Sequence, residues 1–181
     1  WINEGFASYA EYLGFEQLGM MQEAGAWLTD AMDHALNEPD GSVYIPFEEL
    51  WDPGRLFNYR LTYRKGALLL HMIRFELNDD ALFFSILRQF QSEFKNGVAI
   101  GLDFKEVIER LSGRDFSEFF DQWYFGRGYP TYDIVWGQDY DSLWIHSVQI
   151  PSSSETPIFK MPLEFRVNME TKDTLLRVNQ L

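Results

Sequence analysis

Cysteine is absent from this sequence of 181 residues, which excludes disulfides and thiolate metal sites. Basic residues are scarce, because 15 Lys and Arg stand against 28 Asp and Glu and leave a formal net charge of −13. Nucleic-acid binding needs a basic surface, so this charge argues against that class of function. No apolar run reaches the length of a membrane span. The chain is nevertheless 46% hydrophobic and 17% aromatic, enough to bury a core.

Several catalytic motifs are also missing. The three histidines, His34, His71 and His146, include no pair at the spacing of an H-E-x-x-H metal site. There is no G-x-S-x-G nucleophile motif and no phosphate-binding loop. We predict that His71 is a hydrogen-bonded structural residue on a helix and that the other two lie at or near the surface.

Apolar periodicity divides the chain near Tyr129–Pro130. Helical patterns precede that point, at residues 4–36 (two helices broken at Gly19), 62–79, 80–94, 103–112 and 115–125. They place Leu18 on the apolar stripe of the first helix and Asp103 at the N-cap of the helix at 103–112. Short β-rich runs follow it, at residues 131–136, 143–150, 158–167 and 174–179. DYDS is the predicted turn between the first two runs, and METKD the predicted turn between the last two. We therefore predict an α+β fold, with a mainly helical lobe at 1–130 and an antiparallel sheet at 131–181. Residues 37–62 show no periodicity and are predicted to form a long loop, a feature that often lines a site.

Glu4 is the first candidate for chemistry, because it lies among apolar neighbours in WINEGF. A carboxylate there risks desolvation and needs a cation, of which a metal ion is one. An isolated glutamate in a first helical turn is, however, more often a surface residue that matches the helix dipole. Glu11 lies about 10.5 Å further along the same helix face, too far to share a metal with Glu4. It could orient a ligand, but a solvated helix face is the better interpretation.

Tyr63 is the second candidate, because it closes the irregular segment and opens the helix of YRKGA. Its hydroxyl could project from the helix start into a cavity, although spacing alone favours a packing role.

Three stretches together resemble the aminopeptidase N-like family of gluzincin zinc metallopeptidases. WINEGFASYAEY is similar to that family's W-L-N-E-G-F-A segment, and TYRKGALLLHMI to its Y-x-K-G-A segment. FFDQWYFGRGYPTYDIVW resembles the F-x-x-W-x-x-x-x-G-x-P stretch that closes its catalytic domain. The three occur in family order, and the resemblance extends into the strand-rich tail.

The resemblance implies a thermolysin-like catalytic lobe followed by a partial antiparallel β-sandwich. It places the family's third zinc ligand on Glu4, and the tyrosine that steadies the oxyanion of the tetrahedral intermediate on Tyr63. Lys65 and Gly66 would be structural. A catalytic zinc takes three protein ligands and activates a water in its open position. The implied activity is removal of N-terminal residues from peptide substrates.

The family's two histidine ligands and its general-base glutamate come from an H-E-x-x-H segment upstream of the region that this sequence covers. Its G-x-M-E-N segment, which binds the substrate amine, lies further upstream. We therefore expect the downstream half of a catalytic domain, inactive alone and unable to retain zinc. The alternative is a peptide-binding or scaffolding module that kept the fold without the metal, and a weaker one is an unrelated helical domain. An H-E-x-x-H motif before Trp1 would favour the enzyme over the binding module. The sequence makes no prediction of substrate preference, compartment or oligomeric state.

Overall fold

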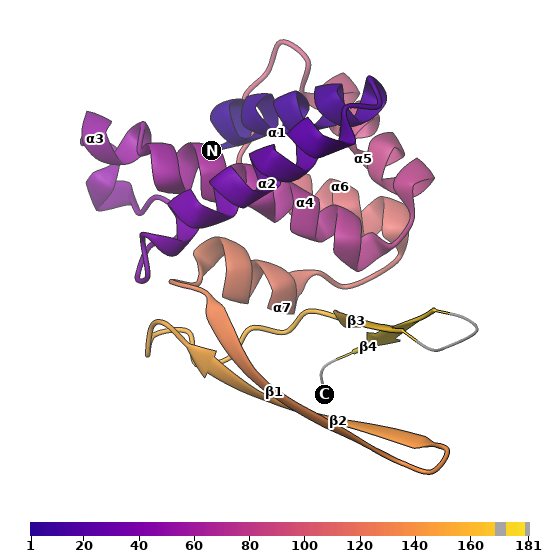
Figure 1. The fold of residues 1–181 in the computed structure, drawn as a ribbon. Helices are drawn as coiled ribbons and strands as arrows, with labels where there is room; N and C mark the ends of the chain where they lie inside the picture. The colour runs from indigo at the N-terminus through magenta and orange to yellow at the C-terminus, as the bar shows by residue number, and fades with distance from the viewer. Residues whose placement is uncertain (169–172, 180–181) are drawn as a thin grey trace.

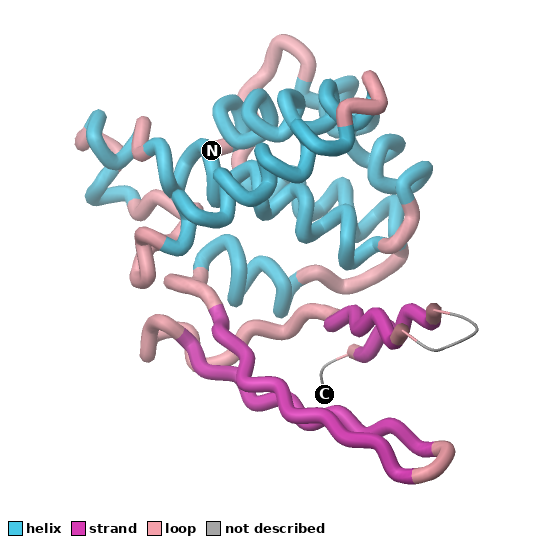
Figure 2. Tube along the Cα trace, in the orientation of Figure 1, coloured by secondary structure: helices cyan, strands magenta, loops and turns pink. Residues whose placement is uncertain are grey.

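The computed structural model describes residues 1–168 and 173–179 of the chain. Helices occupy one side of the molecule, and two β-hairpins lie below them in the view of Figure 1; Figure 2 separates the same elements by type. The longer helices are α1 (Ile2–Gln17), α2 (Met21–Leu36), α4 (Gly66–Leu77), α5 (Asp80–Phe94) and α6 (Gly101–Ser112). The short ones are η1 (Phe47–Glu49), α3 (Pro53–Leu56), η2 (Tyr59–Lys65), α7 (Ser117–Phe119) and η3 (Phe120–Phe125). The strands are β1 (Pro130–Asp139), β2 (Ser142–Pro151), β3 (Leu163–Val167) and β4 (Thr174–Val178). The predicted α+β class with a helical majority is confirmed.

Helix boundaries follow the local chemistry. Gly19 separates α1 from α2 with a φ of +72°, and Gly113 ends α6 with a φ of +68°, a backbone conformation that favours glycine. Asp79 caps α5 by accepting a hydrogen bond from the N–H of Leu82 at 2.9 Å. The prediction that Asp103 begins its helix as the cap was wrong. Helix α6 begins at Gly101, and the Asp103 carboxylate reaches back to the N–H of Ile100 at 2.7 Å.

Aromatic side chains fill the core between α1, α4, α5 and α6. The largest side chains with less than 2% exposure are Tyr9, Phe83, Phe104, Phe116, Phe120 and Phe159. The rings meet edge to face in many cases, for example Phe90 on Phe104 at 5.0 Å between centroids. Leu18, which the helical pattern placed inward, is 75% exposed, because α1 ends at Gln17 and Leu18 lies beyond its last turn. The core therefore fixes α1, which carries Glu4, beside α4, and η2 with Tyr63 leads directly into α4.

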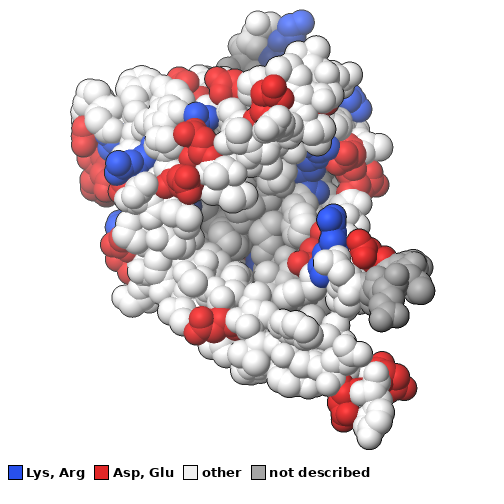
Figure 3. Space-filling model, viewed as in Figure 1, with Lys and Arg blue, Asp and Glu red and all other residues white. Residues whose placement is uncertain are grey.

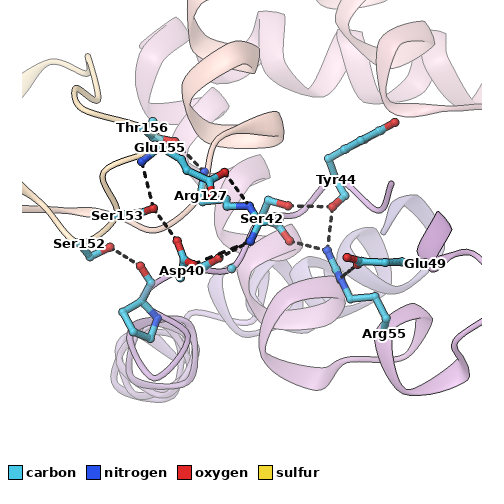
Figure 4. A network of polar contacts seen from close by, with 12 residues as sticks. Asp40, Ser42, Tyr44, Glu49, Arg55, Arg127, Ser152, Ser153, Glu155 and Thr156 are labelled. Carbon is cyan, nitrogen blue, oxygen red and sulfur yellow. Dashed lines mark hydrogen bonds and ion pairs between the residues drawn. The ribbon is translucent and has the colours of Figure 1, made fainter. Parts of the chain in front are cut away.

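The segment 37–62 is more ordered than its lack of periodicity suggested. It contains η1 and α3, and Asp52 caps α3 by accepting from the N–H of Gly54 at 2.8 Å. Figure 4 shows the polar network that holds it. Ser153 donates to the carboxylate of Asp40 at 2.5 Å, and Arg55 donates to the carbonyl of Tyr44 at 2.7 Å. Segment 37–62 is thus held in place by polar contacts, some of them to distant parts of the chain, whereas a regular helix is held by packing its apolar face.

Each β-hairpin is a two-stranded antiparallel sheet. In the first, β1 pairs with β2 from Pro130 opposite Pro151 to Asp139 opposite Ser142, around a two-residue turn at the predicted DYDS sequence. The second joins β3 to β4, and its predicted turn METKD lies outside the described residues except for Asp173. Both hairpins line one cleft, and Figure 3 shows this side of the molecule hollowed between them and the helices.

The base of the first hairpin is attached to the helices by Gln149 and Phe159. Gln149 donates to the carbonyl of Phe159 at 2.7 Å and accepts from its N–H at 2.7 Å. The Phe159 ring is fully buried against Trp123 of η3, with 4.7 Å between the centroids. The Trp123 indole N–H in turn donates to the carbonyl of Lys160 at 3.1 Å. These contacts fix the point at which the strands leave the helical part.

Candidate functional site

Glu4 and Tyr63 lie next to each other, although they are far apart in the sequence. Glu4 is in the first turn of α1, Tyr63 is in η2, and both are partly exposed. Partial burial raises the pKa of the Tyr63 phenol, and Glu4 raises it further through its negative charge and a hydrogen bond. A phenol is protonated at neutral pH even without this shift, so Tyr63 has a proton to donate. The structure brings the two predicted residues together, while their catalytic roles stay predictions.

Tyr63 is presented by a π-helix, an uncommon local structure that often occurs at functional sites. The helix begins after Asn58, whose side-chain oxygen accepts a hydrogen bond from the N–H of Leu61 at 3.0 Å. The helix continues directly into α4 at Gly66. The wider turn of a π-helix changes the direction in which side chains project relative to α4, so it determines where the Tyr63 phenol points.

Two glycines, Gly5 and Gly66, allow α1 to lie close to the junction of η2 and α4. A Cβ atom on Gly5 would lie 3.0 Å from the carbonyl carbon and 3.2 Å from the Cα of Gly66. Gly5 follows Glu4 directly, and Gly66 comes shortly after Tyr63, so the contact between their backbones sets the separation of the two candidate residues. The sequence interpretation of Gly66 as structural agrees with this contact.

We expect Gly5→Ala to destabilise the chain by about 1–2 kcal/mol, because backbone atoms of Gly66 obstruct the new methyl group and outweigh the better helix propensity of alanine. Gly14→Ala is the matched control, since Gly14 lies in the same helix and has no neighbouring atom within 4 Å of the position that a methyl group would take. That change should stabilise the chain by roughly 0.5–1 kcal/mol. Urea unfolding of both variants is the measurement, and an equal effect of the two substitutions would contradict the close-contact explanation.

Lys65 anchors η2 from its other side. Its ammonium group is buried and donates to the carbonyls of Gly41 at 2.5 Å and Gly128 at 2.8 Å. The carbonyl of Gly41 also accepts from the N–H of Gly128 at 3.0 Å. One side chain thus joins the segment 37–62 and the GRGYP stretch to the end of the π-helix that carries Tyr63. Burial and the nearby charge of Arg55 lower the pKa of Lys65 to about 8. The structural role predicted for Lys65 is supported by these contacts.

Residues 1–123 match the family model described as "Peptidase family M1 domain". The chain belongs to peptidase family M1. The match includes both Glu4 and Tyr63 and ends in η3, before the first strand.

Curated relatives carry aminopeptidase names. The chain is 28% identical over 139 residues to "Aminopeptidase N" of Lactococcus lactis, covering 72% of this chain and 16% of that protein. It is 32% identical over 141 residues to "Aminopeptidase N" of Lactobacillus delbrueckii, with the same two shares. It is 26% identical over 180 residues to "Probable aminopeptidase 1" of Sulfurisphaera tokodaii, covering 97% of this chain and 23% of that protein. The chain therefore spans between about a sixth and a quarter of the length of these M1 relatives.

A zinc site, which the M1 family implies, would need more ligands than this part of the chain brings together. Among residues 1–168 and 173–179, no three His, Cys, Asp or Glu side chains are placed to hold a metal ion. Glu4 by itself fits the role of one ligand. It is partly exposed, and no Lys or Arg of the described residues forms an ion pair with it. A cation at its carboxylate would therefore not have to displace a basic side chain.

The histidines do not join Glu4 and Tyr63. His71 shares a 3.2 Å hydrogen bond with the Tyr9 hydroxyl, and burial together with the Arg74 charge lowers its pKa, so it is a neutral structural residue as predicted. His34 contacts the carbonyl of Asp30 at 2.8 Å, and His146 is exposed on β2.

Glu11 was interpreted as part of a solvated helix face, and its side chain is indeed 62% exposed. It also accepts a 2.8 Å hydrogen bond from the indole of Trp27 and lies 3.8 Å from the guanidinium of Arg64. Arg64 occupies the variable position of Y-x-K-G-A, and no local pattern singles it out. Its side chain is only 12% exposed. A charged residue so deeply enclosed beside Tyr63 is the functional candidate that sequence reasoning missed.

In the described part of the chain, every helix is too short or too polar to cross a membrane.

Proposed function

We propose that this chain is the downstream part of the catalytic domain of a zinc aminopeptidase, which removes N-terminal residues from peptides. The observation that carries the proposal is the meeting of Glu4 and Tyr63 in a chain of peptidase family M1. The aminopeptidase names of the curated relatives support the same activity. Residues 1–130 would belong to the catalytic domain, and residues 131–181 would begin a β-sandwich domain.

Glu4 would be one zinc ligand, and the remaining ligands would come from an H-E-x-x-H segment elsewhere in the complete protein. A zinc ion bound there would supply Lewis acidity and water activation. Tyr63 would donate its hydroxyl proton in a hydrogen bond to the oxygen that gains negative charge as the peptide carbonyl is attacked. A phenol is protonated over the whole neutral range, so Tyr63 is available there as a hydrogen-bond donor.

The chain alone would be inactive, because one carboxylate is too few ligands for a tightly held catalytic zinc. We expect calorimetric titration of the isolated chain with zinc to show no stoichiometric binding tighter than about 1 μM. Hydrolysis of leucine p-nitroanilide by the isolated chain should not exceed that of its Tyr63→Phe variant. Tight 1:1 zinc uptake that is lost in Glu4→Gln would contradict the predicted inactivity.

The activity itself is tested on the product of the complete reading frame that contains this chain. We call this product the complete protein. It should bind about one zinc per chain and release the N-terminal residue of short peptides. Glu4→Gln should lower the zinc content measured by mass spectrometry, and Glu11→Gln serves as the control on the same helix face. A complete protein without zinc or peptidase activity would overturn the proposal and favour a peptide-binding module.

A further inference from the structure

Arg64 follows Tyr63 directly in η2, and its guanidinium lies against two aromatic rings. The carbon at its centre is 5.1 Å from the ring centroid of Trp27 and 4.9 Å from that of Tyr59. Trp27 belongs to α2 and Tyr59 begins η2, so these contacts connect the two elements. A planar guanidinium stacks on such rings, whereas an ammonium group presents only a point charge.

Two carboxylates complete the surroundings of Arg64. One terminal nitrogen lies 2.7 Å from the Asp30 carboxylate of α2, and the other lies 3.8 Å from the Glu11 carboxylate of α1. These acids are 47% and 62% exposed, so solvent screens both ion pairs and they hold the side chain only weakly. The ring contacts and the enclosure of a side chain that is 12% exposed therefore contribute more to its placement than the charges do.

The same structure fixes Tyr63. The Tyr59 ring that lies against Arg64 also lies 5.9 Å from the Tyr63 ring, with 33° between the two planes. Tyr59 is the first residue of the π-helix, and Tyr63 stands about one turn later on it. Tyr59 and Tyr63 thus lie side by side on the π-helix, and Arg64 joins this turn to α2 through the Trp27 ring.

The Nε atom of Arg64 is buried and has no hydrogen-bond partner among the described residues. A buried donor without a partner costs stability, so a residue chosen only for packing would be apolar at this position. The unpaired Nε is therefore better explained by a guanidinium plane that the Trp27 and Tyr59 rings hold in one orientation.

We propose that Arg64 is a positioning residue for Tyr63: its guanidinium, held between Trp27 and Tyr59, fixes η2 in the rotation that directs the Tyr63 phenol to Glu4. The inference rests on the proposed function, since positioning matters for catalysis only if Tyr63 acts on the substrate. Arg64 itself acts through Tyr63 and is not a catalytic residue.

The first test uses the NMR chemical shift of the Tyr63 phenol in this chain and does not depend on enzymatic activity. The shift of the Tyr63 ring carbon that carries the oxygen, observed by NMR in chain labelled with ¹³C-tyrosine, reports the interaction of the phenol with Glu4. Glu4→Ala should move this resonance, and Arg64→Lys should move it in the same direction. The two changes combined should move it no further than Glu4→Ala alone. Arg60→Lys is the matched control, because Arg60 lies in the same π-helix with an exposed ion pair to Glu38.

A second variant keeps the test valid if Arg64→Lys does not fold. Arg64→Gln also removes the guanidinium while leaving in place the Tyr59 ring that contacts Tyr63, and it should shift the Tyr63 resonance in the same way. An unchanged Tyr63 resonance in a folded Arg64→Lys or Arg64→Gln chain would overturn the inference.

The second test uses the complete protein and a double-mutant comparison. Arg64→Lys should lower kcat about tenfold with little change in KM and no loss of bound zinc. In a Tyr63→Phe background the same substitution should have no further effect, because Arg64 acts through the phenol. Equal losses in both backgrounds would overturn the inference and leave the proposed function standing. Absence of zinc or peptidase activity in the unaltered complete protein would instead reject the proposed function, and the NMR result would still decide the placement of Tyr63.

Discussion

Replacing Tyr63 by Phe is expected to lower kcat of the complete protein roughly 10²- to 10³-fold, with KM little changed. The substitution keeps the ring that packs beside Tyr59 and removes only the hydroxyl. A hydrogen bond that forms fully only as charge develops on the substrate oxygen contributes to kcat and not to substrate binding. The effect is equivalent to about 3–4 kcal/mol of transition-state stabilisation. Initial rates with a series of peptide concentrations would separate the two kinetic parameters.

Tyr59→Phe is the matched control, because it also removes one phenolic hydroxyl from η2 and keeps a ring for Arg64 to contact. Its kcat should stay within about threefold of the unaltered protein, a range of less than about 1 kcal/mol. If both substitutions lowered kcat equally, the loss would reflect a general disturbance of the π-helix. If Tyr63→Phe had no effect on kcat, the phenol would have no part in the chemistry.

The sequence predicted which residues to consider but not why they meet. Apolar periodicity located α1, α2, α4 and α5, because burying one face of a helix leaves a repeat that can be read directly. The family resemblance singled out Glu4 and Tyr63 within their motifs. Their proximity depends on the backbone contact between Gly5 and Gly66, which becomes visible only when α1 is packed against η2 and α4.

Arg64 and the segment 37–62 show where sequence reasoning ended. Arg64 stands in a position where the motif allows any residue, and nothing local indicates that rings from α2 and η2 will enclose it. The segment 37–62 is held by polar contacts such as that between Ser153 and Asp40, which are 113 residues apart. Hydrogen bonds to carbonyls and carboxylates over such separations leave no periodic pattern, so the sequence predicted a long loop and did not locate η1 and α3 within it.

The turn of the first hairpin was predictable because DYDS is a polar turn sequence between two alternating β-runs. The position of the hairpin relative to the helices was not, since it depends on Gln149 bridging both backbone groups of Phe159. Local elements thus followed from composition and periodicity, whereas their arrangement depended on individual polar contacts.

Lys65 should make the folding stability of this chain rise with pH between about 8 and 10.5. Burial and the Arg55 charge lower its pKa to about 8 in the folded chain, whereas an unfolded lysine keeps the usual value near 10.5. Between these values the unfolded chain binds a proton that the folded chain does not, so each increase in pH favours folding. Over the whole interval the gain is about 3 kcal/mol. A neutral amine still has two N–H groups, enough to keep its contacts with the carbonyls of Gly41 and Gly128.

Urea unfolding at a series of pH values, compared with the Lys65→Met variant, isolates this contribution, because the tyrosines and other lysines titrate alike in both chains. The difference in stability between the two chains should shift in favour of the unaltered chain as the pH rises from about 7 to 10.5. Lys95→Met is the control, since Lys95 is exposed at the end of α5 and should leave the pH profile unchanged. A stability difference that fell with rising pH would mean that the ammonium form is the one favoured by the two carbonyls. Lys65 would then stabilise the junction beside Tyr63 through its charge, and the burial cost would be the smaller of the two effects.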